Sequence, residues 1–273
     1  MNCIDFDAHF SDYWNDWASK NAKRFKRPDD MENELPAVYA SFLQTPAPWL
    51  DGVAPGMYFD RYTDADELCG LLTAYVQHED CSVPDPLLER LASLQDEAPL
   101  LRMVENTTAP CEARMLAVDL LRQMGSAAPM VTYLRWQVAH EENEDLLDNV
   151  LESLHQMGDA VHQPAKIAFL AADTIGKEAL LDILCDFPSD EDVFAFALSS
   201  FQAHRDKRAL FAGYLAKLDD DRALEPLLDI AESNDVSYID FIEIRSAIER
   251  LGGEAPIRNF SSDPTYKATR QLQ

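Results

Sequence analysis

The chain has 273 residues, and its 49 acidic and 23 basic side chains give a formal net charge of −26. Hydrophobic residues make up 47% of the sequence, enough for a sizeable core, and only 9 glycines argue against an all-β fold rich in tight turns. The acidic excess excludes nucleic acid as an expected partner, because phosphates are bound by Lys and Arg. The same charge fits either simple solubility or a surface for a basic partner.

The cysteines and the hydropathy pattern bear on the compartment. The 5 cysteines are scattered and form no Cys-x-x-Cys pair, which favours neither a disulfide framework nor a zinc site and fits a reducing environment. The first residues, MNCIDFDAHF, lack a basic segment followed by an apolar stretch, so we expect no secretory signal. No apolar run reaches the roughly 18 residues that a membrane span needs. We therefore expect a cytoplasmic protein with no membrane partner.

The N-terminal segment differs from the rest of the chain because aromatic side chains dominate it. Residues 6–27 predict an amphipathic helix that ends in a basic cluster closed by Pro28. Residues 31–44 predict a second helix, and residues 45–64 predict a structured loop. We expect residues 1–64 to cap one end of the core; a partner or dimer contact and membrane-surface attachment are the alternatives. The candidate aromatic contacts are Trp14, Trp17, Trp49, Tyr58, Phe59 and Tyr62.

Beyond this segment, apolar helical runs end in the same way at recurring positions. The intervals are mostly about 33 residues, and one is nearer 28. Such recurrence indicates one supersecondary unit stacked several times, because a single amphipathic helix pair cannot bury its apolar faces alone. The recurring ends are Leu91-Ala92, Met124-Gly125, Met157-Gly158, Cys185-Asp186, Leu218-Asp219 and Leu251-Gly252.

Each interval holds two amphipathic runs, which predicts a pair of antiparallel helices. Prolines at or near the predicted starts and glycines at 125, 158 and 252 mark the helix boundaries. Ser189 and Asp220 are expected to act as N-caps. The predicted pairs are 65–79 with 85–95, 97–105 with 111–125, 127–139 with 143–158, 161–173 with 176–186, 190–204 with 207–219, and 222–233 with 237–252.

Three stretches in these pairs, LLRQMGSAAPMVTYL, LAKLDDDRALEPLLDIA and IERLGG, resemble HEAT-type repeats of the short kind found in phycobilisome-lyase-like proteins. The likeness covers residues from about 85 to 252 and departs from the family pattern at Asp186 and Asp219, which replace glycine. It implies an interaction scaffold more often than an enzyme. The expected fold is all-α: a right-handed solenoid of about six helix pairs over residues 65–254, capped by residues 1–64 and followed by a polar tail over 255–273.

The motifs that would carry chemistry are incomplete. The run from Ala171 to Glu178 lacks the first glycine of a phosphate loop, and Glu178 stands where Ser or Thr would hold magnesium. The sequence His140-Glu141-Glu142-Asn143-Glu144 lacks the second histidine of a zinc protease motif. The 6 histidines fall in different predicted helices. We therefore expect no catalytic residue, no metal and no cofactor.

The functional expectation is a non-catalytic scaffold that binds a protein partner, which the net charge favours as basic. One alternative is an acidic inhibitor or immunity-type protein that mimics nucleic acid, and another is a lyase-like enzyme accessory. The oligomeric state stays open. The candidate partner surface is an acidic face on the second helix of each pair, formed by Glu112, Asp119, Asp148, Glu152, Asp240, Glu243 and Glu249.

Overall fold

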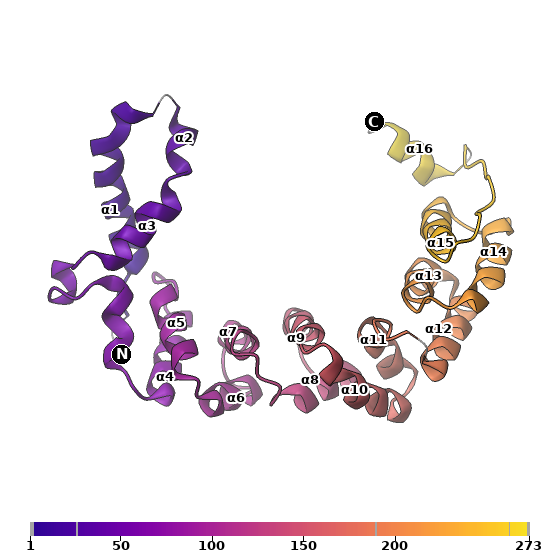
Figure 1. Ribbon diagram of the computed structural model, residues 1–273, viewed down its shortest axis with the longest axis horizontal. Helices are drawn as coiled ribbons and strands as arrows, with labels where there is room; N and C mark the ends of the chain where they lie inside the picture. Colours follow the sequence, from indigo (N-terminus) through magenta and orange to yellow (C-terminus); the bar gives the residue numbers. More distant parts are fainter. Residues whose placement is uncertain (1–2, 26, 189, 262, 272–273) are drawn as a thin grey trace. The chain divides into compact units, whose positions relative to one another are not determined.

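A computed structural model describes residues 3–25, 27–188, 190–261 and 263–271. Over these ranges the chain is all-helical and contains no strand, as the sequence predicted. Figure 1 shows the helices coloured along the sequence. The chain divides into two compact units. Unit 1 comprises Met1–Pro129 with Asn143–Gln156, and unit 2 comprises Met130–Glu142 with Met157–Gln273.

Unit 1 begins with the aromatic segment and continues with packed helix pairs. The predicted helix over 6–27 ends earlier, at Asn21, and a short 3-10 turn follows it. Its α-helices are α1 (Phe6–Asn21), α2 (Pro28–Glu32), α3 (Leu35–Gln44), α4 (Ala65–Val76), α5 (Asp85–Leu94), α6 (Glu97–Glu105), α7 (Cys111–Gln123) and α9 (Glu144–Gln156). Its 3-10 helices are η1 (Ala22–Arg24), η2 (Pro48–Leu50) and η3 (Pro55–Arg61).

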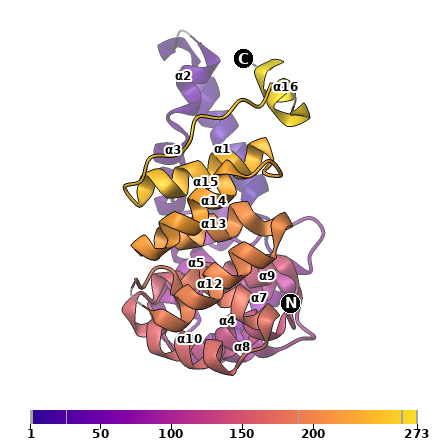
Figure 2. The ribbon, with the colours of Figure 1, turned by 90° about the vertical axis from the view of Figure 1, so that its right-hand side faces the viewer.

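Unit 2 contains the remaining helices, and its neighbouring elements pack side by side, as α12, α13 and α15 do in Figure 2. Its α-helices are α8 (Met130–Ala139), α10 (Asp159–Ala171), α11 (Thr174–Leu184), α12 (Glu191–Ala203), α13 (Arg208–Lys217), α14 (Leu224–Glu232), α15 (Tyr238–Arg250) and α16 (Pro264–Gln271). Its 3-10 helices are η4 (Arg205–Lys207) and η5 (Asp221–Ala223).

From residue 65 onward the predicted helices are confirmed to within a few residues. The single helix predicted over 31–44 is wrong, because a turn at residues 33–34 separates α2 from α3. The pairing of α8 with α9 also needs a correction. α8 packs against α10 and α11, whereas α9 packs against α7, so the two helices belong to different units. The polar tail also contains structure that the sequence did not predict. Phe260 packs its ring 4.9 Å from that of Phe241, and Arg258 donates to the carbonyl of Ala231 at 2.7 Å. These contacts hold the tail against α14 and α15.

Four of the recurring helix ends share a backbone cause. Gly125, Gly158 and Gly252 adopt left-handed backbone angles, with φ of 70°, 55° and 79°. This conformation reverses the chain after a helix, and it is unfavourable for residues that carry a Cβ. Asp219, which replaces glycine at the corresponding position, still adopts φ of 52°. The replacement therefore preserves the turn.

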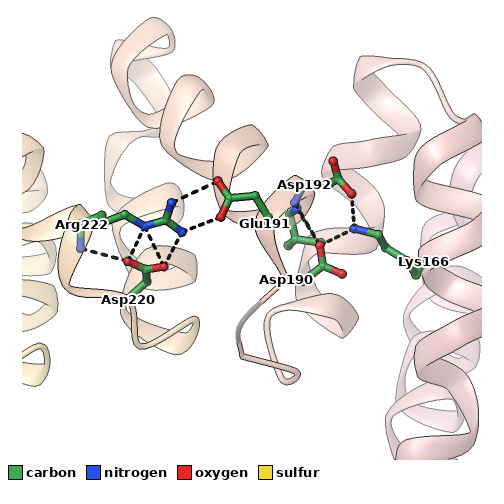
Figure 3. A network of polar contacts seen from close by, with 7 residues as sticks. Lys166, Asp190, Glu191, Asp192, Asp220 and Arg222 are labelled. Atoms are coloured by element: carbon green, nitrogen blue, oxygen red, sulfur yellow. Dashed lines mark hydrogen bonds and ion pairs between the residues drawn. The ribbon is translucent and has the colours of Figure 1, made fainter.

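Capping and ion pairs connect the first helices of successive pairs in unit 2 (Figure 3). The expected cap Ser189 lies outside the described residues; Asp190 caps α12 by accepting from the amides of Asp192 and Val193 at 3.1 and 3.2 Å. Lys166 of α10 donates to Asp190 and, at 2.8 Å, to Asp192. Side chains that cap one helix therefore also bind the neighbouring helix.

A second cluster in the same figure lies one pair further along the chain. The expected cap Asp220 accepts from the amide of Arg222 at 3.0 Å. The guanidinium of Arg222 contacts Asp220 at 2.7 Å and Glu191 of α12 at 2.8 Å (Figure 3). This cluster joins η5 to α12. The side chains of Arg222 and Glu191 are more exposed than those of Lys166 and Asp190.

Candidate functional site

In unit 1 the candidate acidic residues lie on α7 and α9, and two of them share a cation. Arg122 contacts Asp119 at 2.5 Å and Glu152 at 3.0 Å, and its side chain is largely buried. The amide of Asn149 adds a hydrogen bond to Asp119 at 3.1 Å. Asp119 and Glu152 are thus already paired within the protein. The other two candidates in this unit, Glu112 and Asp148, are both exposed.

In unit 2 the candidate acids Asp240, Glu243 and Glu249 all lie on α15. Asp240 accepts a hydrogen bond from Ser237 at 2.6 Å, and Glu249 pairs with Arg245 at 2.7 Å. Glu243 lines a groove of about 410 Å³ between α13 and α15. Lys217 and Arg250 line the same groove, so its charge is mixed rather than purely acidic. The continuous acidic face stays a prediction, because its seven residues are divided between two units.

The aromatic candidates form a contact network in the N-terminal part of unit 1. The ring of Phe6 lies 5.5 Å from Trp49, 5.9 Å from Tyr58 and 5.8 Å from Phe59. The ring of His9 stacks on that of Trp49, with the ring centroids 3.8 Å apart. Phe59 is almost fully buried. These rings therefore contribute to the core of unit 1.

The remaining aromatic candidates lie toward the edges of this network. Trp14 and Trp17 stack at 5.3 Å and are only partly buried. Tyr62 accepts from Arg90 of α5 through its carbonyl at 3.0 Å. The hydroxyl of Tyr75 in α4 bonds to both the amide and the carbonyl of Ile4, at 3.0 and 3.2 Å. Burial raises the pKa of Tyr75 to about 12, so this hydroxyl stays protonated and able to donate. The N-terminal segment is thus fastened to α4 and α5.

An apolar groove between α8 and α10 of unit 2 was not found by sequence reasoning. Its volume is about 530 Å³, and Arg135 is the one charged residue among the described residues that line it. Each helix contributes residues at positions i, i+3, i+4, i+7 and i+8, which is one face of a helix. The lining residues are Val131, Leu134, Arg135, Val138 and Ala139 from α8, Pro164, Ile167, Ala168 and Ala171 from α10, and Ala172 directly after its end.

Small side chains explain why the groove is hollow. Pro164, Ala168 and Ala171 of α10, and Ala172 directly after it, stand where larger residues would fill the space between the helices. The apolar side chains on the rims are exposed to solvent: Val131 is 75% exposed and Ile167 is 68% exposed. The sequence signal for this site was the stretch AKIAFLAA over 165–172, in which apolar residues occupy every side of the helix instead of one stripe.

Comparisons with known proteins add no family: no family model, no curated protein and no solved structure matches the chain. Two further properties concern the described residues alone. They contain no group of three His, Cys, Asp or Glu side chains arranged to hold a metal ion. None of their helices combines the length and the apolar character that crossing a bilayer requires. The surface features of the two units therefore carry the functional argument.

Proposed function

We propose that this protein is a non-catalytic scaffold that binds another protein through a HEAT-like, right-handed helical solenoid. The apolar groove between α8 and α10 is the observation that carries the proposal. Soluble proteins seldom leave neighbouring apolar side chains exposed along a hollow unless another molecule covers them. Val131 and Ile167, on the two rims, bury apolar area only when a partner lies on them.

The repeat architecture supports the same proposal. Helices pack on partners that lie near them in the chain, as α6 does on α7, α12 on α13, and α13 on α15. Left-handed residues close the helices at recurring intervals. Stacks of this kind present long surfaces built from many helices, which suits them to binding proteins.

The acidic-inhibitor alternative has weaker support from the side chains. An electrostatic mimic needs carboxylates that are free to meet a basic partner. Asp119 and Glu152 are instead occupied by Arg122, and Glu249 by Arg245. Their charge is partly neutralised before any partner arrives. Apolar contact is therefore the better supported mode of binding.

The test is an affinity capture with the full chain as bait in an extract of its native cells. Bound proteins are eluted in steps of rising salt and identified by mass spectrometry. We expect specific partners that stay bound at high salt, because salt screens charge pairs but not apolar contact. Capture that disappears steadily with salt would instead support the inhibitor alternative. A bait that retains nothing beyond the blank resin would refute the scaffold proposal.

A further inference from the structure

The two helices that form the apolar groove end at the same place. A Cβ built on Gly176 of α11 would lie 2.7 Å from Val138 and 3.0 Å from Ala172. Val138 is one residue before the end of α8, and Ala172 directly follows the end of α10. α8 and α10 therefore place their C-terminal ends together, and the groove runs along both helices toward this shared end.

Two carboxylates lie at this end of the groove. Glu141 follows the last residue of α8 by two positions, and Asp173 follows the last residue of α10 by two positions. Both side chains belong to exposed residues. The last carbonyl groups of α8 and α10 add partial negative charge, whereas the N-terminus of α11 adds partial positive charge, which Asp173 caps by accepting from the amide of Gly176 at 2.9 Å. Arg135, the one charged residue lining the groove among the described residues, is 3.9 Å from Glu141, and the two side chains are 62% and 57% exposed, so this pair offsets only part of the charge of Glu141.

The dimensions of the groove fit a short helical segment. Val131 and Ala139 are eight residues apart on α8, which corresponds to about 12 Å along the helix axis. This length accommodates about two turns of a third helix, with anchoring side chains at i, i+3, i+4 and i+7. A small apolar molecule inside the groove would leave the outer sides of Val131 and Ile167 exposed to solvent, whereas a helix lying across the rims covers them.

We propose that the groove between α8 and α10 binds an amphipathic helix of a partner protein, with an apolar stripe in the groove and basic residues over the end marked by Glu141 and Asp173. This inference rests on the proposed scaffold function and names the chemistry of its partner. A second copy of the chain is disfavoured as the occupant, because each copy has a formal net charge of −26. A basic partner gains from the same charge.

The test begins with a displayed library of four-turn helical peptides, selected on the full-length protein. We expect enrichment of peptides with apolar residues at i, i+3, i+4 and i+7 and with Lys or Arg near one end. The best peptide is then synthesised with a fluorescent label, and its binding is followed by anisotropy. Enrichment of acidic peptides, or of peptides without helical spacing, would overturn the inference.

Matched variants locate the binding. Ile167→Glu places a charge on the groove rim, and we expect the affinity for the selected peptide to fall by about tenfold or more. Ile257→Glu is the control, because Ile257 is fully exposed and lies outside the groove. Both residues are on the surface, so both variants should fold, which circular dichroism checks. Equal affinity for Ile167→Glu and Ile257→Glu would place the peptide elsewhere and refute the inference.

A third variant tests the charge. Glu141→Lys leaves the apolar lining intact, and we expect weaker binding of the basic peptide together with a smaller dependence on salt. An unchanged salt dependence would exclude the acidic end of the groove as the binding site for the basic residues. Light scattering tests the competing occupant: a wild-type dimer that Ile167→Glu dissociates would identify the groove as a self-association site.

The failures of the two proposals are distinguishable. If cellular proteins are captured equally well by wild type and Ile167→Glu, the groove inference is wrong and the scaffold proposal stands. If the selected peptide binds the groove but no cellular protein is captured, the scaffold proposal fails although the groove has the stated chemistry.

Discussion

The bond between Lys166 and Asp190 allows a quantitative test of how successive helix pairs are held together. Both side chains are only 14% exposed, and Asp190 also caps α12. Asp190→Asn keeps a good cap but removes the charge. A hydrogen bond to a charged group contributes about 1.5–3 kcal/mol, so we expect this variant to lose about 2 kcal/mol of unfolding free energy. Asp190→Ala also removes the cap, which adds about 1 kcal/mol.

Asp220→Asn is the matched control, because Asp220 is also a cap bound to a cation. Each variant leaves the cation one other carboxylate: Asp192 for Lys166 and Glu191 for Arg222. The Asp220 pair is more exposed, with side chains 23% and 55% accessible, so its loss should cost less than about 1 kcal/mol. Equal losses for Asp190→Asn and Asp220→Asn would refute the reasoning that burial strengthens the Lys166–Asp190 bond.

The assay is urea denaturation followed by circular dichroism at neutral pH, with equal m-values required for the comparison. Repeating it at lower pH tests the charge itself. Burial raises the pKa of Asp190, but the hydrogen bonds from Lys166 and the backbone amides outweigh this effect and lower the pKa below its ordinary value of 3.8. The charge therefore stabilises the fold above this value and stops doing so as pH falls through the lowered pKa. The difference in unfolding free energy between wild type and Asp190→Asn should therefore become smaller as the pH falls through this range.

Three further expectations follow from other sites. Gly176→Ala should destabilise the protein, because its new Cβ would lie 2.7 Å from Val138. Gly213→Ala lies in the interior of α13 with nothing within 4 Å of its new Cβ, so it should stabilise the protein by about 0.5–1 kcal/mol. Equal changes in the free energy of unfolding, measured by urea denaturation, would contradict this. Burial raises the pKa of Cys69 and Cys185 to about 12, so a thiol reagent at pH 8 should label Cys3, Cys81 and Cys111 in the native protein and the buried pair only after unfolding. Tyr75→Phe should speed amide exchange in the first turn of α1 by releasing Ile4, and protection equal to wild type would show that the aromatic rings alone hold the segment.

Helix positions were largely predictable from the sequence because their signals are local. Gly125, Gly158 and Gly252 stop helices through backbone angles that few other residues tolerate. Asp220 caps a helix through its own side chain. Such effects involve residues a few positions apart, so they can be predicted from the order of residues in the sequence. The pairing of α8 with α9 was mispredicted because neighbours in sequence were assumed to be partners in packing, whereas α8 packs on α10 and α11.

The candidate acidic surface shows the limit of the same reasoning. The helical pattern placed Asp119 and Glu152 on exposed faces, but it did not reveal that Arg122 binds both. Arg122 and Glu152 are thirty positions apart, and only the packing of α7 on α9 brings them together. Charge counted along a chain therefore overstates the charge that a partner meets.

Composition and periodicity by themselves determined that this chain is acidic and that its described residues are all-helical, because those properties depend on residue type and on neighbours within two helical turns. The tertiary structure alone decided where a hollow remains. Ala168 and Ala171 are ordinary residues of α10, and they line a groove only because α8 stands opposite them and Val131 and Ile167 remain exposed on its rims. A groove is a space that side chains leave unfilled, so no single residue in the sequence marks it. It can be recognised only when the packing of both helices is known.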